Sequence, residues 1–414
     1  MVSSSYDTLS FSEHTLSPAS PAGLPTVRRE RPSAQADGVR GARLLLQEDR
    51  RGCVTWEHEA MSSDTPAPSS EHPLRGCPLG FRDRLVPPAL DSARTADGGM
   101  RLWGAQLPLG VLVCMVSQTI GVTVAIAAGT VLGEARRGSV PGAGLSKALH
   151  YPGGLLIGAI VMAALVLAGY WGIMRLLRRC PVAELAGPGT LRELGVGLAW
   201  GAVLMCTACA VLAAVGVYRI TDAGWNKGVL VGLSAGIMAG FAEEILFRGL
   251  LLRLLEAWLG SWWALTLTAA LFGAMHLGNP GATAFGAVAI ALEAGILLGA
   301  CYLVTRRLWF AIGLHASWNF VQGGVLGSDI SGVGSGRGLF EASFSGPDVL
   351  TGGSMGVEGS VITVVVCTAA GVAMAVTAYQ RGLIVPPVWR RRREAQDAET
   401  SAATAGGPAE CGPR

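Results

Sequence analysis

Uninterrupted apolar blocks of about twenty residues, which recur after Arg101, constrain the fold of this chain more than any other feature. A helix needs about 20 such residues to cross the hydrocarbon core of a bilayer, where its backbone hydrogen bonds must be satisfied internally. Half of the 414 residues are hydrophobic and 15% are charged, whereas soluble domains are roughly a quarter charged. We therefore predict an all-α, polytopic transmembrane helix bundle.

The apolar blocks predict about eight spans. The block 262–278 is short for a full crossing, so the number is approximate. Small residues four positions apart, such as Gly197 and Gly201, indicate helices that pack closely. The spans are expected at 107–132, 154–175, 194–216, 228–255, 262–278, 284–304, 308–326 and 360–379.

Two polar tails flank the predicted transmembrane helical domain, which covers 101–385. Residues 1–100 are rich in Ser, Pro, Arg and Gly, and we expect them to be disordered. Met100 directly precedes the first apolar block and is a candidate start site. Residues 386–414 contain the basic run Arg390–Arg393 and are predicted to form a disordered cytoplasmic tail.

The positions of Lys and Arg between the spans indicate the orientation in the membrane. The positive-inside rule favours cytoplasmic N- and C-termini for a multi-pass protein of the cell membrane. Arg136 and Arg137 are exceptions, because they fall in an outside loop. The Gly/Ser-rich stretch 327–359 is expected to be an outward loop, and we assign it no role. With a net charge of +3 and no basic patch interleaved with aromatic residues, nucleic acid is not an expected partner.

The fourth span carries three ionisable residues: Glu243, Glu244 and Arg248. An unpaired charge near the centre of a membrane helix costs about 2.5–3.5 kcal/mol on insertion scales. Glu244 and Arg248 are four residues apart and can form an ion pair on one helix face. Glu243 lies about 100° around the helix and has no such partner, so it suits a general base. The alternative is that all three charges only hold helices together.

Two further spans carry histidines. Phe272 and His276 are four apart on the fifth span, and His315 and Asn319 are four apart on the seventh. Of the six histidines only these two fall inside apolar spans. His315 and Asn319 could present N–H donors to one point, as stabilisation of an oxyanion requires. His276 could orient a water held by Glu243, which completes the minimum for acyl-transfer hydrolysis.

Three motifs on separate helices together resemble the CAAX-protease and bacteriocin-processing family (CPBP, also called Abi) of intramembrane endopeptidases. The resemblance covers about 195–326, the expected catalytic core. The motifs are E-E-x-x-x-R at Glu243, Glu244 and Arg248, F-x-x-x-H at Phe272 and His276, and H-x-x-x-N at His315 and Asn319.

The resemblance implies an eight-helix bundle around a polar cavity and a role for each motif residue. Glu243 would activate water together with His276, while His315 and Asn319 would stabilise the oxyanion. The substrate would be a membrane-embedded or membrane-associated protein or peptide within the lipid bilayer. Glu293, a further acid in the sixth span, has no assigned role. The residues that would support the site are Glu244, Arg248 and Phe272.

The same residue types also occur in the sites of other membrane proteases. Two histidines and a carboxylate could hold zinc with one position open for water, but the compact H-E-x-x-H motif is absent, and we favour a mechanism without a cofactor. Ser234 faintly resembles a serine nucleophile, yet a buried serine that bonds back to its own helix is the preferred interpretation. Cys206 and Cys209 are interpreted as packing residues.

A non-catalytic chain, such as a membrane immunity or scaffold protein or a small transporter, is the alternative from a different class. Buried acids and histidines also form proton relays in transporters. The polar residues here cluster in one patch instead of lining a path, and no inverted repeat is evident. For a scaffold, the discriminating question is whether Glu243 is needed.

Overall fold

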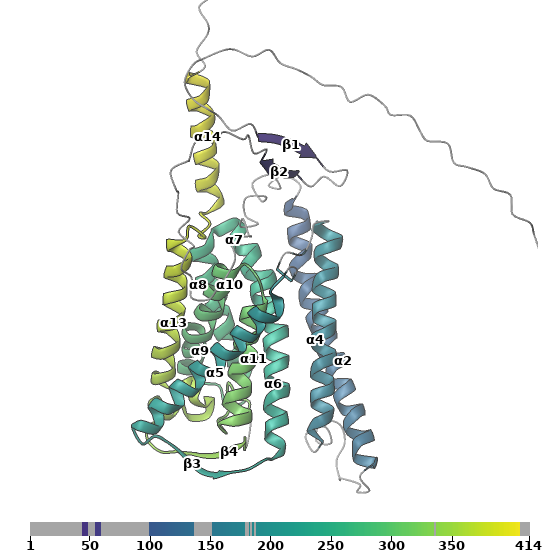
Figure 1. Ribbon diagram of the computed structural model, residues 1–414, viewed down its shortest axis with the longest axis vertical. Coiled ribbons are helices and arrows are strands. Elements are labelled where there is room, and N and C mark those ends of the chain that lie inside the picture. Colours follow the sequence, from purple (N-terminus) through teal and green to yellow (C-terminus); the bar gives the residue numbers. More distant parts are fainter. Residues whose placement is uncertain are drawn as a thin grey trace, which may run out of the picture. The chain divides into compact units, whose positions relative to one another are not determined.

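The computed structural model describes residues 44–48, 54–58, 99–135, 151–178, 182, 184–185, 188–334 and 337–405 (Figure 1). The chain divides into two compact units, Met1–Asp64 and Thr65–Arg414. In the first unit, β1 (Leu44–Glu48) pairs with β2 (Val54–His58) in antiparallel register. This strand pair lies within the tail that was expected to be disordered. The rest of that tail up to residue 98 falls outside the described residues, so its prediction stays a prediction.

The second unit is a bundle of helices, as the apolar blocks predict. The prediction of an all-α transmembrane bundle is confirmed. The helices are α2 (Gly99–Ala135), α4 (Pro152–Ile173), α5 (Thr190–Ala214), α6 (Lys227–Glu244), α7 (Arg253–Leu259), α8 (Ser261–Met275), α9 (Ala284–Ile290), α10 (Ile296–Thr305), α11 (Trp309–Asn319), α12 (Asp348–Thr351), α13 (Val361–Gln380) and α14 (Val388–Ala405).

Several of these helices are joined end to end by π-helical turns. Each turn continues the preceding α-helix without a break, so that α6 and α7 form one long rod, as do α9 and α10. Such turns are rare and occur often at functional sites. The π-helical turns are η1 (Met174–Arg178), η2 (Ile245–Leu252), η4 (Ala291–Gly295) and η5 (Phe320–Val325).

Among the described residues, six helical segments are long and apolar enough to cross a membrane. They correspond to six of the predicted spans. The predicted spans 262–278 and 308–326 are also helical, as α8 and as α11 with η5, but each is shorter than a full crossing. The predicted number of eight membrane spans is therefore approximate. The six segments are Gly104–Leu132, Pro152–Leu177, Thr190–Ala214, Lys227–Leu259, Ala284–Thr305 and Val361–Gln380.

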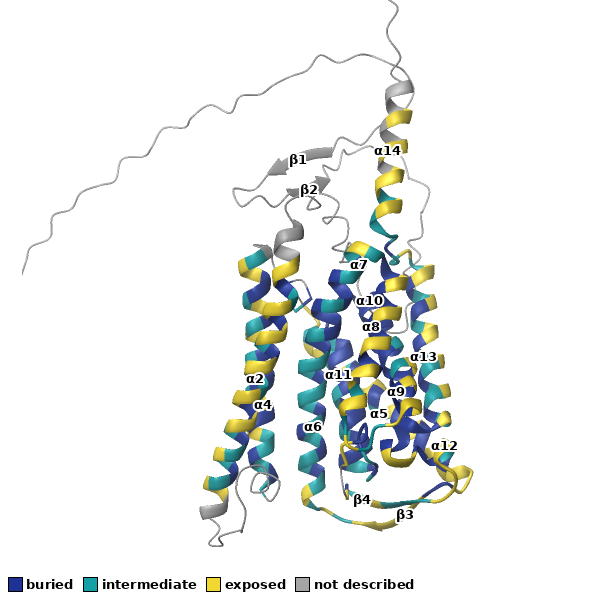
Figure 2. Cartoon of the chain, turned by 180° about the vertical axis from the view of Figure 1, so that it is seen from behind, coloured by how far each residue is buried: buried dark blue, intermediate teal, exposed yellow. Residues whose placement is uncertain are grey.

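Burial follows the pattern expected of a bundle in lipid. In α2, α4 and α13, exposed residues cover one side and buried residues the other (Figure 2). Many of the exposed positions are large and apolar, including Leu112, Met115, Ile160 and Val365. In water such faces would be unfavourable, whereas hydrocarbon solvates them.

The C-terminal tail differs from its prediction. Residues 388–405, expected to be disordered, form α14. The segment is rich in Ala and Arg, which are strong helix formers. Arg390 also donates to Glu394 one turn later, at 3.0 Å, a spacing that supports isolated helices. Helix propensity and the hydrogen bond from Arg391 to the Ala257 carbonyl both favour this helix.

The stretch 327–359, expected to be an outward loop, is folded against other parts of the bundle. Its strand β4 (Phe340–Phe344) pairs with β3 (Tyr218–Ala223), which links α5 to α6. Its backbone also reaches the turn after α8, because the Gly281 amide donates to the Gly332 carbonyl at 2.8 Å. The hydroxyl of Ser354 donates to the Gly281 carbonyl at 2.7 Å. Glycine-rich composition here permits close backbone contact instead of free motion.

Close packing of α5 against α11 depends on glycine. A Cβ on Gly201 would lie 2.2 Å from the Leu314 carbonyl oxygen, and one on Gly197 would lie 2.2 Å from the Phe310 carbonyl oxygen. These neighbours are backbone atoms of a packed helix and cannot rotate away. The spacing of Gly197 and Gly201 was interpreted as a close-packing signal, and the structure confirms it.

We expect Gly201→Ala to lower stability by about 1–3 kcal/mol, because the added methyl overpacks a rigid helix contact. Gly195→Ala on the same helix is the matched control, since nothing lies within 4 Å of its Cβ position. The control should be neutral or stabilising, because alanine has the higher helix propensity. Thermal unfolding in detergent or nanodiscs measures both. Equal midpoints for the two variants would contradict the close contact.

Candidate active site

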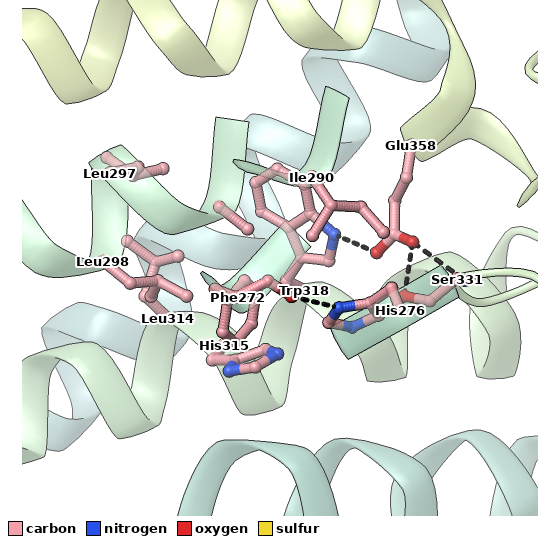
Figure 3. A pocket seen from close by; sticks show the side chains of 11 residues that line it. Phe272, His276, Ile290, Leu297, Leu298, Leu314, His315, Trp318, Ser331 and Glu358 are labelled. Atoms are coloured by element: carbon pink, nitrogen blue, oxygen red, sulfur yellow. Dashed lines mark hydrogen bonds between the residues drawn. The ribbon is translucent and has the colours of Figure 1, made fainter. Parts of the chain in front are cut away.

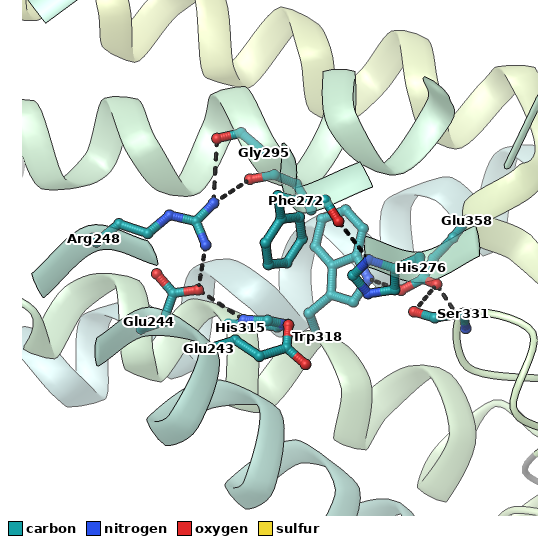
Figure 4. A network of polar contacts seen from close by, with 11 residues as sticks. Glu243, Glu244, Arg248, Phe272, His276, Gly295, His315, Trp318, Ser331 and Glu358 are labelled. Carbon is teal, nitrogen blue, oxygen red and sulfur yellow. Dashed lines mark hydrogen bonds and ion pairs between the residues drawn. The ribbon is translucent and has the colours of Figure 1, made fainter. Parts of the chain in front are cut away.

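A buried ion pair lies at the junction of α6 and η2 (Figure 4). Glu244 Oε1 accepts a hydrogen bond from Arg248 at 2.8 Å, and the two side chains are 0% and 2% exposed. The other terminal nitrogen of Arg248 donates to the carbonyls of Ala294 and Gly295 in η4, each at 3.2 Å. The guanidinium lies 4.7 Å from the centre of the Phe272 ring, in cation–π contact. The ion pair predicted from the four-residue spacing is confirmed.

His315 is held by the same carboxylate. Its Nδ1 lies 2.8 Å from Glu244 Oε1, the oxygen that also accepts from Arg248. A carboxylate can only accept, so Nδ1 carries the hydrogen, and in the neutral ring Nε2 is left as the acceptor. The ring is buried. Glu244 therefore sets both the orientation and the tautomer of His315.

Glu243 faces the outer nitrogen of this imidazole. Its Oε2 lies 3.9 Å from His315 Nε2, and its side chain is 28% exposed. Among the described residues Oε2 has no hydrogen-bond partner. Since 3.9 Å exceeds a direct hydrogen bond, the two groups face each other across a separation that one water can bridge.

His276 lies at the other side of Phe272. Its Nδ1 donates to the Phe272 carbonyl at 2.7 Å, and the two rings are 5.0 Å apart. The Phe272 ring is also 5.9 Å from that of His315. Phe272 thus separates the two histidines and shields the ion pair behind it. The chain places His276 at the end of α8, where the 3-10 turn His276–Gly278 begins.

A small cavity of about 10 Å³, room for roughly one water molecule, adjoins both histidines (Figure 3). Its walls come from η4 and its neighbouring helices, which supply apolar side chains, and from Trp318 and the polar pair Ser331 and Glu358. Asn319 lies one turn after His315, buried at the point where α11 passes into η5.

The structure brings most of the residues predicted from the sequence into one cluster. It differs from the prediction in which histidine faces Glu243. His315, expected to stabilise the oxyanion, is the histidine that faces Glu243, the position that was expected for His276. Residue spacing defines the face of a helix and cannot define which helix it meets. Glu244 accepts from both Arg248 and His315, and the Phe272 ring lies against both histidines; the supporting role expected of Glu244, Arg248 and Phe272 stays a prediction.

Sequence reasoning missed the group around Glu358. Its Oε1 accepts from the Trp318 indole N–H at 2.9 Å. Its Oε2 accepts from the Ser331 amide at 2.8 Å and the Ser331 hydroxyl at 2.6 Å. The three-residue interval from His315 to Trp318, which places both on one helix face, was the available signal.

Other polar residues have simpler accounts. The hydroxyl of Ser234 donates to the Leu230 carbonyl at 2.7 Å, which confirms the back-bonding interpretation. Glu293 is fully buried in η4, and neither of its oxygens has a partner among the described residues. Across the ranges that the structure describes, no three His, Cys, Asp or Glu side chains are arranged to hold a metal ion.

Comparison with known families agrees with this geometry. Residues 225–321 match the family model of Type II CAAX prenyl endopeptidase Rce1-like proteins. No curated protein and no solved structure gives a significant match. The match covers less than a quarter of the chain, and together with the long apolar helices it indicates similarity to multi-pass membrane proteases. The resemblance to the CAAX-protease family is thereby confirmed over a segment that contains every motif residue.

We expect Arg248→Met to reduce accumulation of the folded protein strongly. The change leaves the Glu244 carboxylate buried without its counter-ion, at a cost of about 3–5 kcal/mol. The double variant Glu244→Gln with Arg248→Met removes both charges and should recover much of the loss. Quantitative immunoblots of membranes and thermal midpoints measure this. Additive losses in the double variant would show that the pair is not coupled.

Proposed function

We propose that this chain is an intramembrane endopeptidase in which Glu243 is the general base. One observation carries the proposal: the unpartnered oxygen of Glu243 faces His315 Nε2 at 3.9 Å. The opposite nitrogen of that ring is fixed by Glu244 at 2.8 Å. A carboxylate and an oriented imidazole on two sides of one water position are what activation of water requires.

The proposed reaction begins with a water between Glu243 Oε2 and His315 Nε2. Glu243 accepts a proton from this water as the water oxygen attacks the carbonyl carbon of the scissile peptide bond. The carbonyl oxygen becomes an oxyanion in the tetrahedral intermediate. When the C–N bond breaks, Glu243 returns the proton to the leaving nitrogen, which gives a carboxyl and an amine end.

The remaining residues of the site position the His315 imidazole or stabilise the oxyanion. Glu244, neutralised by Arg248, holds His315 in one tautomer. We assign stabilisation of the oxyanion to the Asn319 amide, as the motifs imply. His315 takes the place beside Glu243 that the motifs imply for His276, because the 3.9 Å separation belongs to His315. His276 lines the cavity, with its Nδ1 bonded to the Phe272 carbonyl. No cofactor is needed for any of these steps.

The proposed substrate is a protein or peptide that is embedded in the membrane or attached to it. The family name refers to a prenyl endopeptidase, so prenylated C-terminal tails belong among the substrates to be tested. Both termini are proposed to be cytoplasmic, in agreement with the basic run Arg390–Arg393 after the last span.

The decisive variant is Glu243→Gln, which keeps the shape of the side chain and removes the base. We expect loss of cleavage by about 10²–10⁴-fold, the usual contribution of a general base. Protein termini in membranes and medium would be compared between wild type, a deletion strain and the variant. Glu341→Gln, a change at a half-exposed acid outside the site, is the matched control.

If products vanish in the deletion and in Glu243→Gln while the variant protein accumulates, the protease proposal stands and the missing ends name the substrate. If Glu243→Gln behaves as wild type while the deletion does not, hydrolysis at this site is wrong. A non-catalytic scaffold or immunity role would then account for the deletion phenotype.

A separate measurement tests the zinc alternative. We expect the purified protein to keep its activity after dialysis against a strong chelator, because Glu243 and His315 suffice to activate water in the proposed mechanism. Activity would be followed together with the metal content of the same sample. Loss of activity that added zinc restores would overturn the mechanism without a cofactor.

A further inference from the structure

A second cavity, of about 290 Å³, lies beside β4, at the end of the bundle where β3 and β4 pair (Figure 1). It is much larger than the cavity beside the histidines, and its wall is mostly polar. Residues of β4, of the loop after η5 and of the turns around α12 line it. The proposed reaction makes no use of this space.

One side of this cavity is the free edge of β4. In an antiparallel pair, residues that bond to the partner strand alternate with residues whose backbone groups point away from it. The Ser345 amide donates to the Val217 carbonyl of the β3 side at 2.9 Å. Ala342 and Phe344, one and three positions before Ser345, therefore point their backbone groups away from β3. Both line the cavity, and no other described segment bonds to their backbone.

The cavity also carries negative charge. Asp348, which is exposed, and Asp329 line it, and the lining residues include no Lys or Arg. The whole stretch 327–359 has four acids and one basic residue, Arg337. That arginine is already paired with acids of β3 and β4. A positively charged partner is therefore favoured here by its electrostatic complementarity.

A shared turn joins this cavity to the candidate active site. Asp329 lines the larger cavity and Ser331 lines the cavity beside the histidines, and two residues span at most about 7 Å. The Ser328 hydroxyl, on the wall of the larger cavity, accepts from the Val357 amide at 3.0 Å. The next residue, Glu358, accepts from Ser331. A chain bound along β4 thus lies within a few residues of the proposed site of cleavage.

We infer that the larger cavity binds an extended, positively charged segment of the substrate as an added strand beside β4. The main chain of this segment pairs with Ala342 and Phe344, and a Lys or Arg side chain faces Asp348. Main-chain pairing gives affinity, while the charge gives the preference for a basic segment. The segment lies near the scissile bond and takes no part in breaking it. This inference rests on the proposed function.

Binding is measured apart from cleavage, with the full-length Glu243→Gln variant in phosphatidylcholine nanodiscs. The probes are a fluorescent octapeptide that alternates Lys with Val, the same peptide with Glu in place of Lys, and a fully N-methylated form of the Lys peptide. Fluorescence anisotropy, corrected with empty nanodiscs, gives the dissociation constants. We expect the Lys peptide to bind and the Glu peptide not to bind. The N-methylated form lacks main-chain donors and should bind at least about tenfold more weakly.

A second substitution in this parent tests the charge. Asp348→Asn keeps the shape of the side chain and should weaken binding of the Lys peptide about two- to fivefold, as expected for an exposed ion pair. Glu341→Gln is the matched control, because this acid of β4 does not line the cavity, and it should bind the peptide as the parent does. Equal affinities for the Lys and Glu peptides, or for Asp348→Asn and its parent, would overturn the inference. So would an absence of peptide binding together with an Asp348-dependent rise of the thermal midpoint in Ca²⁺, which would make the cavity a cation site.

Cleavage kinetics distinguish the two levels of failure. With the substrate that the comparison of termini names, Asp348→Asn in the otherwise wild-type protein should raise KM with little change in kcat, because it removes binding that the ground state and the transition state share. If cleavage requires Glu243 but Asp348→Asn leaves KM unchanged, the protease proposal stands and the docking role is wrong. If cleavage persists in Glu243→Gln, the protease proposal fails and the docking of a substrate fails with it.

Discussion

The carboxylate of Glu244 is the group on which the rest of the site depends. It is completely buried, and a single oxygen accepts from both Arg248 and His315 at 2.8 Å. An isolated charge at this depth would be prohibitive, but the guanidinium neutralises it and is itself held by two carbonyls of η4. The pair thus ties three separate helical rods together: α6 with η2, α9 with η4 and α10, and α11. The same contact that stabilises the bundle orients the imidazole that faces Glu243.

Local features were predictable from the sequence, because helix geometry relates residues that are close along the chain. The ion pair Glu244–Arg248 follows from a four-residue spacing, and the back-bonded Ser234 follows from a small polar residue inside an apolar helix. The span boundaries also agree with the apolar blocks to within a few residues at most ends. In each case a short stretch of chain contains all the information that the prediction needs.

Contacts between helices could not be predicted in the same way. That His315 and not His276 faces Glu243 depends on how α6 and α11 are rotated against each other, which a single sequence does not specify. The π-helical turns were missed because their residues are as apolar as those of the adjoining α-helices. Glu358 was missed because the Gly/Ser-rich composition around it is typical of loops, although here it permits close backbone packing and a wall of the cavity.

The π-helical turns have a consequence for how this chain tolerates changes of length. Three of them, η2, η4 and η5, directly follow or contain Glu244, Glu293 and Asn319. Each turn widens the helix locally and holds about one residue more than an α-helical turn does. Loss of that residue would return the helix to ordinary α geometry with little rotation of the side chains beyond it. Loss of a residue from an α-helical part would instead turn those side chains by about 100°, to another face of the bundle. Within these helices, changes of length by one residue among natural variants are therefore expected at the π-helical turns and not between them. Connections outside the site helices have no such restriction, so differences in chain length are expected to accumulate there.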